Sequence, residues 1–410
     1  MTWGFETKAI HAGCQTQGNG VPTAVPIIQS ASFSYDTAAD LEDVFAGRQL
    51  GHVYSRISNP TVAALEARYV QLENGLAGAA YSSGMAAIVA VVETLCESGD
   101  HMVASSGLFG GTLTLFDEVL SRRGIGVTWV EGRDKGAWES ACQDRTRLFF
   151  VESISNPKLD VADIPALSSL AASRGVPLVV DNTLTTPYLA SLRQMGAHVS
   201  VNCMGKYVSG TGGTIGGIAV DLGTFDWTCS HAPLVKQSVK RFGAYGFMAA
   251  MKKGVTTHTG SCLSPMNAHL IMLGMESLAL RMQRHCDNAL GLAVALSEHP
   301  LIQSVTYPGL SLHPDADTIG TWYGGRGGAI VTCQTASKSD AFALIDSLQL
   351  VRRASNLGDA KTLIIHPAST IYREASPERR AMAGVYDGTV RVSVGIETLD
   401  DLIGDFFRSA

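Results

Sequence analysis

Residues 176–210, VPLVVDNTLTTPYLASLRQMGAHVSVNCMGKYVSG, decide the fold. The apolar runs VPLVV and HVSV predict two buried strands, and the segment LASLRQMG between them predicts a helix. A strand, a helix and a strand in this order are typical of a parallel sheet with helices on both faces. Ligands of such sheets bind beyond the carboxyl ends of the strands. Asp181 ends the first strand and Lys206 follows the second, so both are candidate site residues.

The same alternation extends over the first half of the chain. It predicts helices at 60–74, 85–100, 112–124 and 164–175, and strands near 78–82, 101–106, 126–132, 147–154 and 216–222. Residues 1–60 are expected to form loops and short elements. Residues 264–300 predict one long or two kinked helices, and short strands with helices follow them. We therefore predict an N-terminal arm at 1–60, an α/β domain with a mostly parallel sheet at 61–262, and a smaller α+β domain at 263–410.

The composition is that of a globular enzyme. The chain has 410 residues, of which 46% are hydrophobic and 17% are charged, and a net charge of −6. This charge disfavours nucleic acid as a partner. The longest apolar run, AAIVAVV, is far shorter than the roughly 18 residues of a membrane span. The eight cysteines show no CxxC spacing, which disfavours a disulfide framework or a zinc site. We see no secretory signal and expect a cytoplasmic protein without a bound metal.

Lys206 allows three interpretations: a phosphate-loop lysine, a surface lysine and a nucleophile. A phosphate loop needs G-x-x-x-x-G-K-[ST], but Ser200 stands at the first glycine position and Tyr207 follows the lysine. That interpretation fails at two positions. A surface lysine is the plain alternative on position alone. The glycine-rich segment that follows, SGTGGTIGG, would let the backbone pass close to a bulky ligand.

Four other signals are weak when each is taken alone. Asp181 has two interpretations: it caps the turn after the strand, or it pairs with a cation such as a pyridinium nitrogen. The segment SSGMAA (82–87) also has two interpretations: an ordinary turn between a strand and a helix, or an anion site at a helix N-terminus. Tyr54 and Arg56 in YSRISNPT belong to a solvated loop or clamp a phosphate. Arg391 in RVSVGIE is paired at a sheet edge or holds a substrate carboxylate through two hydrogen bonds.

Together these motifs resemble the trans-sulfuration family of pyridoxal-phosphate (PLP) enzymes over nearly the whole chain. The resemblance rests on IHAG, YSRISNPT, SSGMAA, ESISNP, VVDNT, the lysine with its glycine-rich follower, YPGL, GDAKTLIIHPAST and RVSVGIE. The C-terminal half is most similar to the O-acetylhomoserine sulfhydrylase branch. The resemblance implies a fold-type-I PLP-dependent transferase with a role in methionine biosynthesis. It also implies a homo-oligomer, at least a dimer and by family habit a tetramer.

The resemblance also implies a role for each site residue. Lys206 would form the Schiff base with PLP and move protons, and Asp181 would pair with the pyridinium nitrogen. The backbone of Gly84 and Met85 would bind the phosphate, Phe109 would stack on the ring, and Asn156 would lie near the ring hydroxyl. Cys203 would also contact the cofactor. Tyr54 and Arg56 would reach the phosphate of a neighbouring subunit, and Asn356 and Arg391 would bind the substrate.

The sequence departs from the family pattern at three places. The Ser/Thr pair that usually precedes the lysine is replaced by Cys203 and Gly205, so two hydroxyl donors to the phosphate are missing. The ring-stacking tyrosine is replaced by Phe109, which keeps the aromatic face but loses the phenol. Asn356 stands where a serine is common, which favours the sulfhydrylase branch over the lyases.

The resemblance implies γ-substitution on an activated homoserine ester, with O-acetylhomoserine and sulfide giving homocysteine and acetate. Three alternatives stay open. The first is methionine γ-lyase-type elimination to 2-oxobutyrate and ammonia. The second is γ-substitution with a non-sulfur nucleophile in a specialised pathway. The third, from a different class, is a catalytically inactive PLP-fold binding protein.

Overall fold

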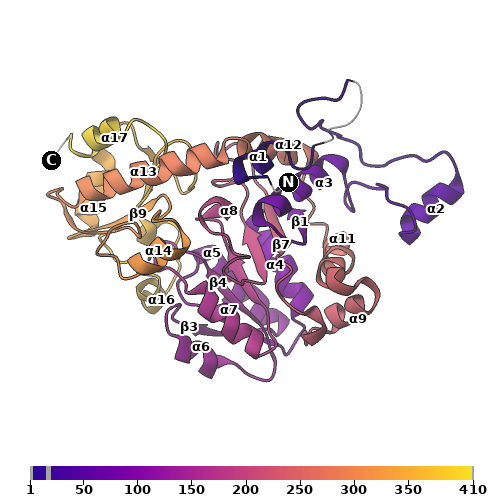
Figure 1. The fold of residues 1–410 in the computed structure, drawn as a ribbon. Helices are drawn as coiled ribbons and strands as arrows, with labels where there is room; N and C mark the ends of the chain where they lie inside the picture. Colours follow the sequence, from indigo (N-terminus) through magenta and orange to yellow (C-terminus); the bar gives the residue numbers. More distant parts are fainter. Residues whose placement is uncertain (1–2, 15–19, 409–410) are drawn as a thin grey trace.

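The computed structural model describes residues 3–14 and 20–408, and a seven-stranded sheet forms the centre of the molecule (Figure 1). Its strands lie in the order β1-β7-β6-β5-β4-β2-β3. They are β1 (Ala77–Tyr81), β2 (His101–Ser105), β3 (Gly126–Val130), β4 (Thr146–Glu152), β5 (Leu178–Asp181), β6 (Val199–Asn202) and β7 (Gly217–Asp221). The predicted α/β fold with a mostly parallel sheet is confirmed.

Strand β7 is the exception to the parallel arrangement. It pairs antiparallel with both β1 and β6, whereas β2–β3, β2–β4, β4–β5 and β5–β6 are parallel pairs. Parallel neighbours need a crossover connection, which is usually a helix. Residues 203–216, which join β6 to β7, contain no helix, and the chain therefore returns alongside β6 in the opposite direction.

Helices cover the sheet and begin at residues suited to helix starts. Asn59 accepts hydrogen bonds from the backbone N–H groups of Thr61 and Val62, and Pro60 occupies the first turn of α3. The helices of this part are α3 (Pro60–Glu73), α4 (Gly84–Leu95), α5 (Gly110–Thr114), α6 (Lys135–Ala141), α7 (Ile164–Ser173), α8 (Thr186–Leu189), α9 (Pro233–Phe242), α10 (Gly246–Ala249) and α11 (Thr257–Thr259). Two π-helical segments, Leu115–Leu120 and Ala250–Thr256, continue α5 and α10.

The helix predicted at 189–196 is wrong. Helix α8 ends at Leu189, and Ala190 is extended, with φ −119° and ψ 109°. The Asn182 side chain donates to the carbonyl oxygen of Ala190, and residues 192–196 form turns. Leu192 and Met195 are buried all the same. The apolar residues of this segment are therefore buried without forming a helix, because tertiary contacts outweigh the helix propensity of the sequence.

The N-terminal region contains two short helices, α1 (Phe5–His11) and α2 (Ala38–Ala46). Figure 1 shows α2 on an arm that stands away from the body of the molecule. None of its residues is buried. Two apolar side chains of the arm are strongly exposed, Phe45 at 66% and Leu50 at 99%. The arm thus has an apolar surface that nothing in the described chain covers.

The C-terminal part contains a second sheet, in the order β10-β11-β12-β9-β8. Its strands are β8 (Ile302–Thr306), β9 (Ile330–Thr335), β10 (Arg352–Arg353), β11 (Leu363–Ile365) and β12 (Thr389–Ser393). Its helices are α12 (Pro265–Met275), α13 (Leu278–Leu296), α14 (Ala316–Trp322), α15 (Lys338–Ser347), α16 (Pro377–Met382) and α17 (Leu399–Phe406). The residues predicted as one long or two kinked helices form two helices, α12 and α13.

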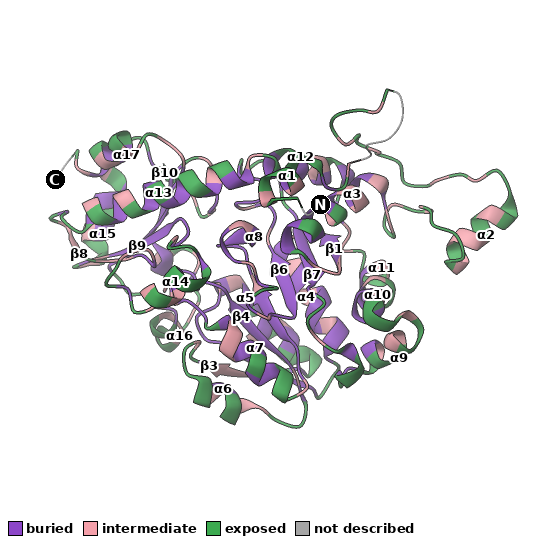
Figure 2. Cartoon of the chain, viewed as in Figure 1, coloured by how far each residue is buried: buried purple, intermediate pink, exposed green. Residues whose placement is uncertain are grey.

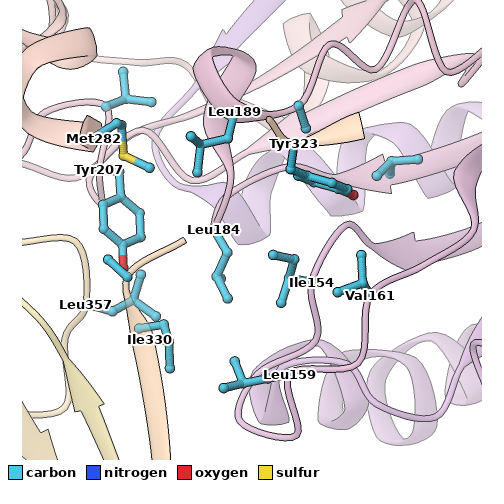
Figure 3. Close-up of a cluster of buried hydrophobic side chains, with 14 of the residues drawn as sticks. Ile154, Leu159, Val161, Leu184, Leu189, Tyr207, Met282, Tyr323, Ile330 and Leu357 are labelled. Atoms are coloured by element: carbon cyan, nitrogen blue, oxygen red, sulfur yellow. The ribbon is translucent and has the colours of Figure 1, made fainter. Parts of the chain in front are cut away.

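A continuous apolar cluster joins the two sheets (Figure 3). Ile154 and Leu184, from the loops after β4 and β5, lie in the same cluster as Ile330 and Leu357 of the C-terminal part. Burial of an aliphatic side chain of this size contributes roughly 1.5–3 kcal/mol. Figure 2 shows that buried residues run through the sheets and exposed ones over the outer helices. The cluster therefore fixes the two parts against each other beside the strand ends.

No helix in the described part of the chain is long and apolar enough to cross a membrane.

Candidate active site

A cavity of about 210 Å³ lies where the carboxyl ends of the central strands meet the C-terminal part. Most residues predicted for the site share this cavity. Its lining consists of Ser83, Gly84, Met85, Ile88, Phe109, Thr112, Glu152, Asn156, Asp181, Thr183, Leu184, Cys203, Lys206, Ser355, Leu357 and Arg391. Chain segments more than 300 residues apart in the sequence thus contribute to one site.

Lys206 lies in the turn that follows β6. The turn is closed by backbone hydrogen bonds from Lys206 N–H to the Cys203 carbonyl (3.1 Å) and from Gly210 N–H to the Lys206 carbonyl (2.8 Å). Gly205 lies close to residues 214 and 215, and a Cβ there would sit 2.7 Å from the Thr214 carbonyl oxygen. A side chain at position 205 would displace the turn. This explains in packing terms why a glycine occupies a position where the family usually has a hydroxyl residue.

The Lys206 amine contacts Asn356, which in turn contacts Arg391. Its Nζ donates a hydrogen bond to Oδ1 of Asn356. The guanidinium of Arg391 donates to the backbone carbonyl of Asn356 (2.9 Å) and to Oδ1 of Asn156 (3.2 Å). Asn356 therefore lies between the amine and the guanidinium, and contacts both.

The surroundings of Lys206 lower its pKa. Burial is the largest cause, because it disfavours the charged ammonium, and the positive charge of Arg391 acts in the same direction. A negative charge on Cys203, if its thiol were ionised, would oppose this shift. A lysine with a lowered pKa offers more neutral amine near neutral pH, which both nucleophilic attack and proton transfer require.

Asp181 ends β5, and its side chain borders the same cavity. Its Oδ1 accepts a hydrogen bond from the Thr183 backbone N–H (2.9 Å). Burial raises the pKa of this carboxyl, and the hydrogen bonds from Thr183 oppose the rise. A cation placed beside Asp181 would restore the carboxylate, so the site is suited to a positively charged ring nitrogen.

The N-terminus of α4 forms another wall of the cavity. The Ser83 hydroxyl caps this helix by accepting a hydrogen bond from Ala86 N–H (3.1 Å). A Cβ at Gly84 would lie 2.7 Å from Cβ of Cys203, so only glycine allows the helix to approach the lysine turn this closely. Burial raises the pKa of the Cys203 thiol. Cys203 is thus a neutral thiol, which is a weaker hydrogen-bond donor than a hydroxyl.

Phe109 precedes α5 and lines the cavity. Its backbone N–H donates to Oε1 of Glu152 (2.7 Å). The phenol of Tyr372 donates to the carbonyls of Leu108 (3.1 Å) and Asn156 (3.0 Å). The turn that carries Phe109 is therefore held from both sides. Phe109 itself brings no proton donor into the cavity.

Tyr54 and Arg56 do not line this cavity. Both are exposed, and the Arg56 guanidinium lies 5.4 Å from the centre of the Tyr54 ring and donates to the Thr257 carbonyl. The structure thus separates these two residues from the other predicted site residues of the same chain.

Sequence reasoning missed Glu152, Thr183 and Ser355 as lining residues. Glu152 had a signal: it stands at the end of an apolar strand, as Asp181 does, and the two residues pair in register between β4 and β5. Thr183 carried no signal of its own; its hydroxyl accepts a hydrogen bond from the Cys203 backbone N–H (2.8 Å) and so links the two loops.

Two buried polar atoms of the cavity residues have no hydrogen-bond partner among the described residues. They are Nε of Arg391, which is 2% exposed, and Oε2 of Glu152, which is 6% exposed. Buried polar groups are normally paired, so these two residues keep hydrogen-bonding capacity that the described chain does not use. Pyridoxal phosphate requires an amine for its aldehyde, a carboxylate for its ring nitrogen and an anion site for its phosphate. The cavity offers all three groups, in Lys206, Asp181 and the N-terminus of α4. The fold and site therefore define the class of PLP-dependent enzymes.

The chain belongs to the Cys/Met metabolism PLP-dependent enzyme family, whose model matches residues 6–409. It is 39% identical to the O-acetyl-L-homoserine sulfhydrylase of Corynebacterium glutamicum, over 98% of this chain and 96% of that protein. It is 37% identical to the L-methionine gamma-lyase of Pseudomonas putida, over 98% and 96% of the two chains.

A solved structure has the same fold. It is a putative O-acetylhomoserine (thiol)-lyase from Campylobacter jejuni, with a TM-score of 0.92, 30% sequence identity and 99% of each chain covered. That structure contains N'-pyridoxyl-lysine-5'-monophosphate at its position 205. The predicted family, fold type and cofactor are confirmed.

Proposed function

We propose that the protein catalyses γ-substitution on an activated homoserine ester, with O-acetylhomoserine and sulfide giving homocysteine and acetate. In this reaction the Cγ–O bond breaks and a Cγ–S bond forms. The observation that carries the proposal is the single cavity that gathers the Lys206 amine, the Asp181 carboxyl and the Arg391 guanidinium. The identity to the C. glutamicum sulfhydrylase over nearly the full chain supports the substrate class.

The chain's own residues would share the work as follows. Bound PLP supplies an electron sink for carbanionic charge. Asp181 keeps the ring nitrogen charged, and the neutral amine of Lys206 takes and returns protons at the substrate's α and β carbons. Arg391 binds the α-carboxylate. Its guanidinium lines the cavity and is held in a fixed orientation between Asn156 and Asn356, which supports this role.

The remaining cavity residues would hold the cofactor in place. The backbone of Gly84 and Met85 would bind the phosphate at the N-terminus of α4. Phe109 would stack on the ring, and Asn156 would lie near the ring hydroxyl. Cys203 would contact the cofactor as a weak donor, so the phosphate would depend more on charged and backbone donors.

The leaving group is tested with a panel of homoserine esters. The purified holoenzyme is incubated with sulfide and the O-acetyl, O-succinyl or O-phospho ester of L-homoserine, and the products are identified by mass spectrometry. We expect homocysteine from the acetyl ester at the highest rate. Turnover of none of the three esters would contradict the proposed substrate class.

We also propose that the active unit is at least a dimer, and that dimers assemble into a homotetramer. The segment that carries α2 supports this, because it exposes the apolar side chains of Phe45 and Leu50 and stands away from the body of the molecule (Figure 1). Tyr54 and Arg56 would contact the cofactor phosphate in a neighbouring copy. Arg56 would matter most, since the usual hydroxyl donors are absent at Cys203 and Gly205.

Arg56→Ala is expected to weaken PLP retention markedly, because a charge-assisted phosphate contact is lost. Arg56→Ala and Lys206→Ala proteins are dissociated, mixed and reassembled, and activity is measured. The hybrid dimer would contain one site with both residues intact, so partial activity should return. Arg48→Ala, on the same arm but paired with Glu42 and Asp43, serves as the control. Hybrids that form but stay inactive would mean that Arg56 acts within its own subunit.

A further inference from the structure

Two carboxyl groups lie side by side at the edge of the central sheet. Glu152 ends β4 and Asp181 ends β5, and the two residues pair in register. Both border the cavity. One ring nitrogen can offset one negative charge, and the proposed function assigns that partner to Asp181. Glu152 is left without a role.

Only one of the two carboxyl oxygens of Glu152 has a hydrogen-bond partner in the described part of the chain. Oε1 accepts the Phe109 N–H at 2.7 Å. Oε2 is buried and has no partner in the described part of the chain. The side chain faces Asp181 of β5, the phenol of Tyr372 and the backbone of Asn156, and no lysine or arginine forms an ion pair with it among the described residues. A carboxylate in this position would be a buried charge without a counter-ion.

We propose that Glu152 is a positioning residue that works in its neutral form: one oxygen holds the Phe109 turn, and the other donates a hydrogen bond to an anionic oxygen of the bound cofactor or substrate. This proposal rests on the cofactor site described above. A protonated carboxyl has one O–H donor and keeps its acceptor oxygen, so a single side chain can do both.

The electrostatics of the site agree with the geometry. Burial raises the pKa of Glu152 well above its ordinary value, and the charge of Asp181 raises it further. The Phe109 N–H, which donates to Oε1, offsets only part of this rise. Neighbouring buried carboxyls rarely ionise together, because the second charge is repelled by the first. With the cofactor bound, Asp181 would keep the charge opposite the ring nitrogen, and Glu152 would keep the proton.

The test compares two substitutions of nearly equal size. Glu152→Gln keeps a neutral acceptor and a donor, whereas Glu152→Leu removes both. Cofactor is removed from the wild type and each variant, and the protein is titrated with pyridoxal phosphate to obtain its dissociation constant. Glu298→Leu, at an exposed position, is the control for the loss of a glutamate. Circular dichroism and thermal unfolding show whether each variant is folded.

We expect Glu152→Gln to bind within about threefold of the wild type, and Glu152→Leu to bind about tenfold more weakly or worse, as for a buried hydrogen bond that is lost. If the acceptor belongs to the substrate, cofactor binding by Glu152→Leu will be nearly unchanged. In that case the Glu152→Leu holoenzyme should instead bind L-homoserine, an unreactive substrate analogue, about tenfold more weakly than the wild-type holoenzyme does.

Two results would overturn the proposal while leaving the cofactor site intact. One is a Glu152→Gln variant as weak as Glu152→Leu, which would show that a negative charge is required. The other is a folded Glu152→Leu variant that binds both cofactor and analogue like the wild type. A wild-type protein that fails to bind pyridoxal phosphate would instead refute the cofactor site and this proposal together.

Discussion

Replacing Lys206 with alanine is expected to abolish turnover and the visible absorption of the bound cofactor. Lys206 is the only lysine among the described residues that lines the cavity, so no other amine is placed to bond to the cofactor aldehyde. The same amine is the proposed proton carrier. General acid–base catalysis alone typically contributes about 10²–10⁴-fold, and the covalent attachment is lost in addition. The activity should therefore fall by at least that factor.

The measurement combines an absorption spectrum with an assay on O-acetylhomoserine. Lys240→Ala, at an exposed position on α9, is the matched control and should keep both the absorption and the activity. Borohydride should remove the visible band of the wild type by reducing the bond between cofactor and lysine. A Lys206→Ala protein that keeps the band and turns over would show that the assignment of the lysine is wrong.

The second prediction with a large effect concerns Phe109 and the choice of substrate. A thiolate is a poor leaving group and gains from a nearby acid, whereas acetate leaves readily without one. The Phe109 ring lines the cavity but cannot donate a proton. We therefore expect kcat/KM for O-acetylhomoserine to exceed that for methionine by at least ~10²-fold, the lower end of the usual contribution of general acid catalysis.

Phe109→Tyr should raise elimination from methionine more than it raises ester replacement. Phe342→Tyr, on the outer face of α15, adds the same hydroxyl far from the cavity and should change neither rate. Equal effects of Phe109→Tyr on both reactions would mean that Phe109 only packs on the ring and that another group or water supplies the proton. Efficient cleavage of methionine by the wild type would favour the γ-lyase alternative, in line with the P. putida relative.

The sequence could predict which residues stand at the carboxyl ends of the central strands. Asp181 and Lys206 each follow a short apolar run, and parallel strands bring their carboxyl ends to one edge of the sheet. The lining positions of Gly84, Met85, Phe109, Asn156, Cys203 and Arg391 agree with the resemblance. Asn356 contacts Lys206 and Arg391 but was expected only from the family pattern.

Other features depend on contacts that a single sequence does not reveal. Residues 189–196 carry an apolar spacing that predicts a helix, yet most of them form turns, in which Leu192 and Met195 are buried and the Asn182 side chain bonds the carbonyl of Ala190. The importance of Glu152 lies in its burial beside Asp181, which needs the sheet register. The direction of β7 depends on the absence of a helix in the preceding connection. The proposed contact of Arg56 with the cofactor of a neighbouring copy is a prediction that the structure of one chain does not test.

The most direct test of the proposed activity is the fate of O-acetyl-L-homoserine with and without sulfide. The holoenzyme is incubated with the ester at several sulfide concentrations, and homocysteine and 2-oxobutyrate are quantified by mass spectrometry. We predict that homocysteine is the main product whenever sulfide is present and increases with its concentration. If 2-oxobutyrate and ammonia form at the same rate with and without sulfide, and no homocysteine appears, the proposed substitution is contradicted.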